Sequence, residues 1–130
     1  MNKLMTISIL IFLLLSCSLM KEDTLPNYDA KLLSITDRSL LAYMNDGLIY
    51  SSRHQVIATF SNDTLRNSQG QALGYIASMQ VFTMDHQQLG LVENNHLKNR
   101  TGQTIAYVEG KESSAKVGLA ISMFFFFLND

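Results

Sequence analysis

The sequence predicts an all-β protein: five 16-residue β-hairpin repeats in a closed, pseudo-five-fold, propeller-like array, followed by a hydrophobic C-terminal strand. Three observations predict this fold class. A small residue recurs every sixteen positions, a large aliphatic residue precedes it each time, and Asn, Asp and Gly recur between the apolar runs. The small-residue column is Ala42, Ala58, Gly74, Gly90 and Ala106, and the column before it is Leu41, Ile57, Leu73, Leu89 and Ile105.

Each unit has room for two short strands and two turns. One apolar run such as QALGYIA precedes a polar turn and a second run such as MQVFT. Sixteen residues are too few for a βαβ unit, but they fit two strands of about five residues. Tight turns are expected at Asn45-Asp46-Gly47, Asn62-Asp63 and Asn94-Asn95, because these residue types tolerate positive φ. A lone hairpin is marginal in water, so the units are expected to bury one another's faces.

The C-terminal segment departs from the repeat. After Glu109 the chain continues through GKESSAK, which we expect to be a polar loop, and ends VGLAISMFFFFLND. Because Phe124 to Phe127 are consecutive, a strand here would be apolar on both faces. We therefore expect burial of this strand, either closing the ring or filling its centre, in preference to contact with lipid.

The repeated G-Q-x-[IL]-[AG]-Y-[IV], the five units and the aromatic C-terminus resemble the five-fold β-flower proteins of bacterial envelopes. The resemblance covers residues 32 to about 128 and implies the five-petalled fold, without implying an activity. Two units depart from the pattern, since Thr59 and Leu91 stand where the family has Tyr. Because of these departures, the five units are not expected to be fully equivalent, although the same fold is expected.

The N-terminal segment has the features of a targeting signal. Residues 1–16 have Lys3 followed by an apolar core from Leu4 to Leu15, too short to cross a bilayer, which is typical of a signal peptide. Leu14-Leu15-Ser16-Cys17 resembles the lipobox of bacterial lipoproteins, in which the Cys is lipidated. The expected organisation is therefore a signal peptide at 1–16, the lipidated Cys17 with a tether at 17–30, and the repeat domain at 31–130.

Lipidation would explain why the chain has a single cysteine. Two or three acyl chains, at about 0.8 kcal/mol per buried methylene, would hold the protein on a membrane. We expect a lipid-anchored protein of the bacterial cell envelope, with the outer membrane favoured, facing the periplasm or the surface. The alternative is an ordinary secretory signal with a chance Cys.

Charge and composition argue against a nucleic-acid partner. The formal net charge is −1, and charges of both signs are scattered along the chain. With no second cysteine, no disulfide can form within the chain. Burial is therefore expected to stabilise the fold.

The histidines give a weak metal signal. His54 and His86 share a column with Arg38, Gly70 and Gly102, which indicates a turn position in the left-handed conformation. His96 lies in a different column, near a hairpin tip, and no third ligand follows at a useful spacing. We expect neither a metal nor a cofactor.

Two further columns are candidates for a binding rim. A ring of carboxamides could hydrogen-bond a sugar or a peptide, and aromatic faces could stack on a glycan. The interpretations we favour are that each Gln serves its own turn and that the tyrosines pack between strands. The candidate residues are Gln55, Gln71, Gln87 and Gln103, with Tyr43, Tyr75 and Tyr107.

Catalysis finds little support, and we do not expect an enzyme. The candidate carboxylates are dispersed, and no serine elbow, phosphate loop or paired acids recur. The function favoured is a non-catalytic binding module for a glycan or a peptide. The alternative is a structural or accessory subunit of an envelope complex, which predicts an exposed apolar patch; a hydrolase is the least favoured.

Overall fold

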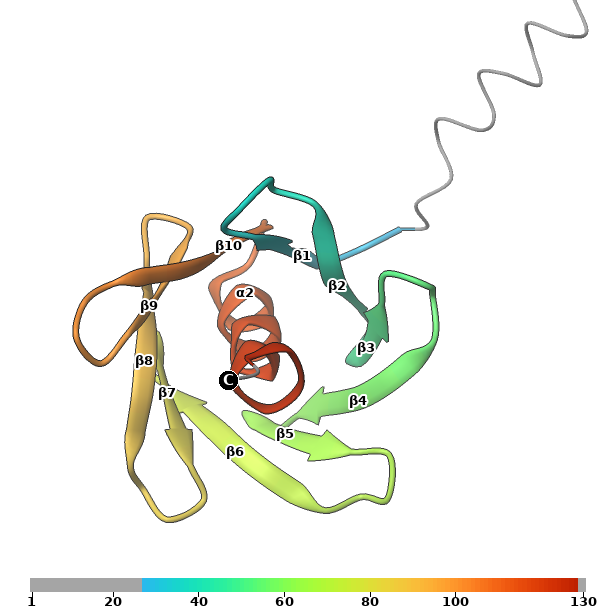
Figure 1. Ribbon diagram of the computed structural model, residues 1–130. Helices are drawn as coiled ribbons and strands as arrows, with labels where there is room; N and C mark the ends of the chain where they lie inside the picture. Colours follow the sequence, from blue (N-terminus) through green and yellow to red (C-terminus); the bar gives the residue numbers. More distant parts are fainter. Residues whose placement is uncertain (1–26, 129–130) are drawn as a thin grey trace, which may run out of the picture.

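The fold is a closed antiparallel barrel of ten strands with a helix along its middle (Figure 1). The computed structural model describes residues 27–128. A short helix, α2 (Ser113–Ala120), and a π-helical turn, η1 (Met123–Phe127), follow the last strand. The strands are neighbours in chain order: β1 (Ala30–Ser34), β2 (Leu40–Asn45), β3 (Leu48–Ser51), β4 (Val56–Ser61), β5 (Thr64–Asn67), β6 (Ala72–Ala77), β7 (Gln80–Thr83), β8 (Gln88–Glu93), β9 (His96–Asn99) and β10 (Thr104–Gly110).

Four two-residue turns join strands at one end of the barrel, which we call the turn end. Positive φ at both residues is the mark of a type I′ turn, whose twist matches that of its strands. The turns expected at 45–47, 62–63 and 94–95 are confirmed, and the fourth has no Asn, Asp or Gly. The turn residues with positive φ are Asp46 and Gly47, Asn62 and Asp63, Ser78 and Met79, and Asn94 and Asn95.

The opposite end of the barrel, which we call the loop end, carries five longer connections: residues 35–39, 52–55, 68–71, 84–87 and 100–103. The fifth hairpin is made of the first and the last strand of the repeat region, β1 and β10. There β10 pairs with β1, from Ala30 opposite Gly110 to Ser34 opposite Ala106. This pairing closes the sheet, so no strand edge is left open. The expected closed array of five hairpins is confirmed.

A β-bulge next to each loop explains why a large and a small apolar residue stand side by side in every unit. Ile49 lies opposite Ala58 and Tyr50 opposite Val56, so Ile57 is the extra residue in β4. A bulge re-aims the strand locally, and the extra residue packs against the core together with its neighbour. The extra residues in the five bulges are Leu41, Ile57, Leu73, Leu89 and Ile105.

Helix α2 fills the barrel, and the small-residue column makes room for it. Val117 to Ile121 are buried on all sides of the helix, as expected for a helix with no solvent face. A Cβ at Gly74 would lie 2.5 Å from the carbonyl oxygen of Phe82 and 2.9 Å from Cδ1 of Ile121. The small residues of the column therefore stand where the strands approach their neighbours and the central segment closely.

The expected C-terminal strand is wrong, and so is the polar loop expected before it. The segment is α2 followed by η1, and α2 begins at Ser113, inside the expected loop. The physical reason is hydrogen bonding: inside a closed sheet every neighbouring strand is already paired, so a central strand would have unpaired backbone groups, whereas a helix bonds to itself. Of the alternatives left open, the segment fills the centre.

The N-terminal expectations lie outside the described residues. The signal peptide at 1–16, Cys17 and the tether as far as residue 26 belong to this part of the chain. The described chain enters the barrel at the turn end, because the Asp29 N–H donates to the carbonyl oxygen of Met44 and the Asp29 carboxylate accepts from the Asp46 N–H.

Candidate functional site

The hairpin β2–β3 carries an aromatic–histidine cluster on the outer face of the barrel. Tyr43 stacks on Tyr50 with ring centroids 4.9 Å apart, and its hydroxyl lies 2.8 Å from Nδ1 of His54. Burial of Tyr43, with the nearby Tyr50, raises the pKa of its hydroxyl. The hydrogen bond engages Nδ1 and leaves Nε2 of His54 without a partner among the described residues.

The hairpin β6–β7 repeats this cluster 32 residues later. Tyr75 stacks on Phe82 with ring centroids 5.1 Å apart, and its hydroxyl lies 2.8 Å from Nδ1 of His86. Both histidines are exposed and sit in loops, with φ of 67° and 71°. We call these two hairpins, with the loops that follow them, the aromatic petals.

The third tyrosine of the column meets a cation instead. His54 and His86 stand eleven positions after their tyrosines, but eleven positions after Tyr107 the repeat has ended. Because the ring closes, the first loop, residues 35–39, takes the place of that loop beside Tyr107. The guanidinium of Arg38 lies 4.0 Å from the centroid of the Tyr107 ring. Arg38 has φ of 60°, so the expected left-handed turn position is confirmed in this loop as in the others.

The two columns also vary together, a signal that the sequence contains but that pattern reasoning missed. The units that have Thr59 or Leu91 in place of tyrosine carry Gly70 and Gly102 at the loop position, with φ of 83° and 89°. A histidine at a left-handed position costs conformational energy that a tyrosine partner offsets, and without that partner the loop has glycine.

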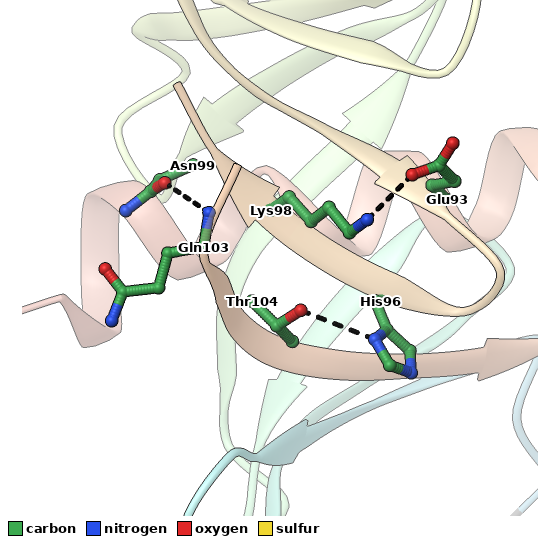
Figure 2. A network of polar contacts seen from close by, with 6 residues as sticks. All are labelled: Glu93, His96, Lys98, Asn99, Gln103 and Thr104. Atoms are coloured by element: carbon green, nitrogen blue, oxygen red, sulfur yellow. Dashed lines mark hydrogen bonds and ion pairs between the residues drawn. The ribbon is translucent and has the colours of Figure 1, made fainter. Parts of the chain in front are cut away.

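His96 belongs to a different network, shown in Figure 2. Its Nδ1 lies 3.4 Å from the hydroxyl of Thr104, and its ring packs edge-on to Tyr107 at 5.2 Å. Beside it Lys98 forms an ion pair with Glu93 at 2.7 Å, and this contact lowers the pKa of the Glu93 carboxyl. The contacts of His96 are therefore those of a strand-packing residue.

The loops are held by side chains that the sequence analysis did not single out. Oδ1 of Asn99 accepts the N–H group of Thr101 at 3.1 Å. It also accepts the N–H group of Gln103 at 3.0 Å (Figure 2). Three other loops use the same geometry, with an oxygen of the last strand residue accepting from the residue four positions on. The accepting residues are Ser51, Asn67, Thr83 and Asn99.

The glutamine column lies at the loop end, and its side chains are exposed. Gln55, Gln71, Gln87 and Gln103 each use the backbone N–H for the loop contact just described. Gln71 Oε1 also accepts from Nδ2 of Asn67, in its own loop, at 3.2 Å. In Figure 2 the Gln103 carboxamide points away from the loop contact. These carboxamides face solvent around one end of the barrel.

The comparison with protein families decides the classification. The family described as 5-fold beta-flower protein matches residues 20–128. The chain belongs to this family. No curated protein and no solved structure is significantly similar to this β-flower protein.

The loop end of the β-flower domain is apolar at its centre. Phe124 to Phe127 of η1 are half-buried there, and Leu128 is 50% exposed. Three more exposed apolar side chains, Ile35, Val56 and Met84, lie in or next to the loops of this end.

Two shallow pockets lie at the turn end, around the start of α2. One is lined by Tyr28, Asp29, Lys111, Glu112 and Ala115. The other lies between two turns, next to Val117. Neither contains a histidine or any residue of the Gln and Tyr columns, so the sequence-derived candidates and the pockets occupy different parts of the β-flower domain.

Within residues 27–128, no three His, Cys, Asp or Glu side chains gather closely enough to hold a metal ion. Over the same residues, no helix combines the length and apolarity that a membrane span requires.

Proposed function

We propose that this β-flower protein is a non-catalytic binding module for a glycan or a peptide, anchored to a bacterial envelope membrane by lipid on Cys17. The observation that carries the binding role is the pair of aromatic petals. Each places an exposed histidine and an exposed glutamine at the loop end, beside a stacked aromatic pair. Tyr43 is buried, so the aromatic surface open to a ligand comes from the half-buried Tyr50 in one petal and Tyr75 and Phe82 in the other.

The chemistry of the aromatic petals suits sugars and polar peptides. Aromatic faces pack on the apolar face of a sugar ring, while carboxamide and imidazole groups bond its hydroxyls. Gln55 follows His54 directly, as Gln87 follows His86. The backbone of both loops is held by hydrogen bonds to Ser51 and Thr83, so ordering it on binding costs little.

Replacing His86 with Gly tests the binding role without disturbing the loop. Glycine suits the φ of 71°, and Gly70 and Gly102 already occupy the equivalent positions. With soluble peptidoglycan fragments as the probe, His86→Gly and Gln87→Ala are each expected to weaken binding about tenfold, the value of one hydrogen bond of about 1.4 kcal/mol. Calorimetric titration measures it.

The matched control is Gln71→Ala, in a loop that has glycine instead of histidine. This variant is expected to bind like the parent. Equal loss in Gln71→Ala and Gln87→Ala, or no binding by the parent to peptidoglycan, capsule or lipopolysaccharide fragments, contradicts the proposal.

The anchor is tested separately by replacing Cys17 with Ser. Without the thiol no thioether to diacylglycerol can form, so the protein is expected to move from the membrane fraction to the soluble fraction. Mass spectrometry of the parent should find the acyl chains on Cys17. A parent protein without them would contradict the anchor and leave the binding role to its own test.

A second candidate function is that of a structural or accessory subunit of an envelope complex. The exposed Ile35, Val56, Met84 and Leu128 favour it, because all four lie at the loop end, where they could meet a partner protein. Co-purification of one stoichiometric partner from solubilised envelopes, lost in Leu128→Ser, would support this candidate.

A further inference from the structure

The charges of the β-flower domain are divided between its two ends. All four arginines of the chain lie in or beside the loop-end connections, and all four are exposed: Arg38, Arg53, Arg66 and Arg100. Two carboxylates, Asp37 and Asp85, accompany them. The other six carboxylates within residues 27–128 lie toward the turn end: Asp29, Asp46, Asp63, Glu93, Glu109 and Glu112.

The two kinds of cation also differ in their partners. Among the described residues, both ion pairs use lysines: Lys31 with Glu109 at 3.7 Å and Lys98 with Glu93 at 2.7 Å. No arginine has a carboxylate partner there. Arg66 donates to the carbonyl oxygen of Gly70, and Arg38 lies over a tyrosine ring. At the loop end, four guanidinium groups therefore stand against two carboxylates, and among the described residues none of the four forms an ion pair.

Most of the exposed apolar side chains lie at the same end of the barrel as the arginines. Six large apolar side chains within residues 27–128 are exposed, and four of them lie at the loop end: Ile35, Val56, Met84 and Leu128, at 41%, 49%, 45% and 50%. The half-buried phenylalanines of η1 lie between them. Their position follows from the course of the chain. Helix α2 starts at the turn end beside Asp63, and the residues after it, Ile121, Phe124 and Phe125, lie against Gly74 and Gly90 further toward the loop end.

We propose that the loop end is a surface for binding a lipid bilayer that carries anionic phosphate headgroups. The surface has an apolar centre surrounded by arginines that form no ion pair. On such a bilayer the apolar side chains would contact the acyl chains and the arginines would contact the headgroup phosphates. Arginine suits this place because its planar fork bonds two phosphate oxygens at once. A protein partner would have to supply both a large apolar face and several carboxylates.

Within residues 27–128, the first residues of the chain lie away from this surface. The described chain enters the barrel at the turn end through Asp29, on the side opposite to η1. The inference does not depend on acylation of Cys17, because the loop end is formed entirely by residues 35–128. It adds a membrane contact made by the folded domain itself, at the same end as the aromatic petals, so a bilayer and a glycan would compete for this end.

The test uses residues 18–130 without lipid, which contain the whole closed ring and its central helix. We expect this chain to float with vesicles of phosphatidylcholine mixed with phosphatidylglycerol and to stay behind with phosphatidylcholine alone. Arg53→Gln and Arg100→Gln are each expected to reduce partitioning about fivefold, since a basic residue near an anionic surface is worth about 1 kcal/mol. Raising the salt concentration should weaken binding in the same direction.

Matched variants at the turn end provide the control. Leu128→Ser is expected to weaken flotation, whereas Leu48→Ser, an exposed leucine at the opposite end, and Lys111→Gln are expected to leave it unchanged. The chain has no tryptophan, so one introduced residue reports its own surroundings. Emission from Leu128→Trp should shift to the blue and be quenched by brominated lipid, and emission from Leu48→Trp should not.

Two outcomes would overturn the inference. One is no flotation with either vesicle and no quenching of Leu128→Trp by brominated lipid, which would show that the loop end does not bind a bilayer. The other is equal loss in the loop-end and turn-end variants, which would mean non-specific adsorption. Neither outcome bears on glycan titration or on acylation of Cys17, so failure here and failure of the proposed function remain distinct.

Discussion

At the scale of single residues, the loop position shared by Arg38, His54 and His86 shows how a strained backbone is compensated. A non-glycine residue with positive φ costs roughly 1 kcal/mol or more. At His54 and His86 a hydrogen bond from tyrosine offsets this cost, and at Arg38 the stacked Tyr107 ring does. The same contacts hold the side chains that could meet a ligand in a defined orientation.

Replacing Tyr43 with Phe should remove a pH dependence at the alkaline end. Burial raises the pKa of Tyr43 above 10.0 in the folded protein. The unfolded chain ionises first, so stability falls as pH rises from about 10 towards the folded-state pKa. Urea titrations at about pH 9 and about pH 11 should show a smaller loss in Tyr43→Phe than in the parent.

The control for this substitution is Tyr28→Phe, at an exposed tyrosine. This variant should keep the alkaline loss of the parent protein. An unchanged loss in Tyr43→Phe would show that another group causes it.

Replacing Gly74 with Val should destabilise the fold. The added Cβ would lie 2.5 Å from a backbone oxygen and 2.9 Å from Ile121, so the strand or the helix must shift. Overpacking of this kind costs about 1–3 kcal/mol. Ala77→Val, at an exposed position of the same strand, should leave the urea midpoint nearly unchanged. Equal midpoints for the two variants would mean that the small-residue column is not tightly packed.

At the scale of elements, the ring of strands determines the helical conformation of α2, and α2 in turn fills the interior of the ring. The segment from Ser113 to Phe127 is short and ends in a run of phenylalanines, a weak helix former in isolation. It is helical because Val117 to Met123 are buried inside the ring, where no strand has a backbone group free to pair with them. In return it fills a space that the hairpins cannot fill with their own small residues.

Replacing Gly118 with Val tests this mutual dependence. A Cβ at Gly118 would lie 2.5 Å from the Phe60 ring, so the variant is expected to lose about 1–3 kcal/mol of stability. Combining it with Phe60→Ala removes the clash, and the double variant should lose less than the sum of the two single losses. Unfolding free energies of the four proteins measure the coupling. Strict additivity would mean that helix and petal do not touch.

At the scale of the whole molecule, closure joins the first strand to the last. Since β1 pairs with both β2 and β10, the chain cannot lose its first strand without opening the sheet. Solenoids unfold from their ends, but a ring has none. The β-flower domain is therefore expected to unfold as a single cooperative unit.

Leu32→Ala and Leu65→Ala test this cooperativity from two places in the ring. Both leucines are fully buried, so each change should cost about 2–5 kcal/mol. Both variants should show one transition, with circular dichroism and tyrosine fluorescence coinciding. An early, separate phase in Leu32→Ala alone would mean that β1 opens independently.

Much of the candidate site could be predicted from residue type, because turn chemistry is local. Asn, Asp, Gly and His marked positions of positive φ that the structure confirms, whereas Ser78-Met79 gave no such signal. The pairing of tyrosine with the loop position could have been found from the joint variation of the two columns. Its last member, Tyr107 with Arg38, could not, because their contact exists only once the ring has closed.

The sequence by itself determined the repeat, the hairpins and the crowded small-residue column, because a period of sixteen and the chemistry of turns act over a few residues. Only the tertiary structure decided that residues 113–127 form a helix. Their apolar pattern suits burial in any conformation, and the choice depends on whether a neighbouring backbone is free to pair. In a closed ring none is, so the segment satisfies its own hydrogen bonds.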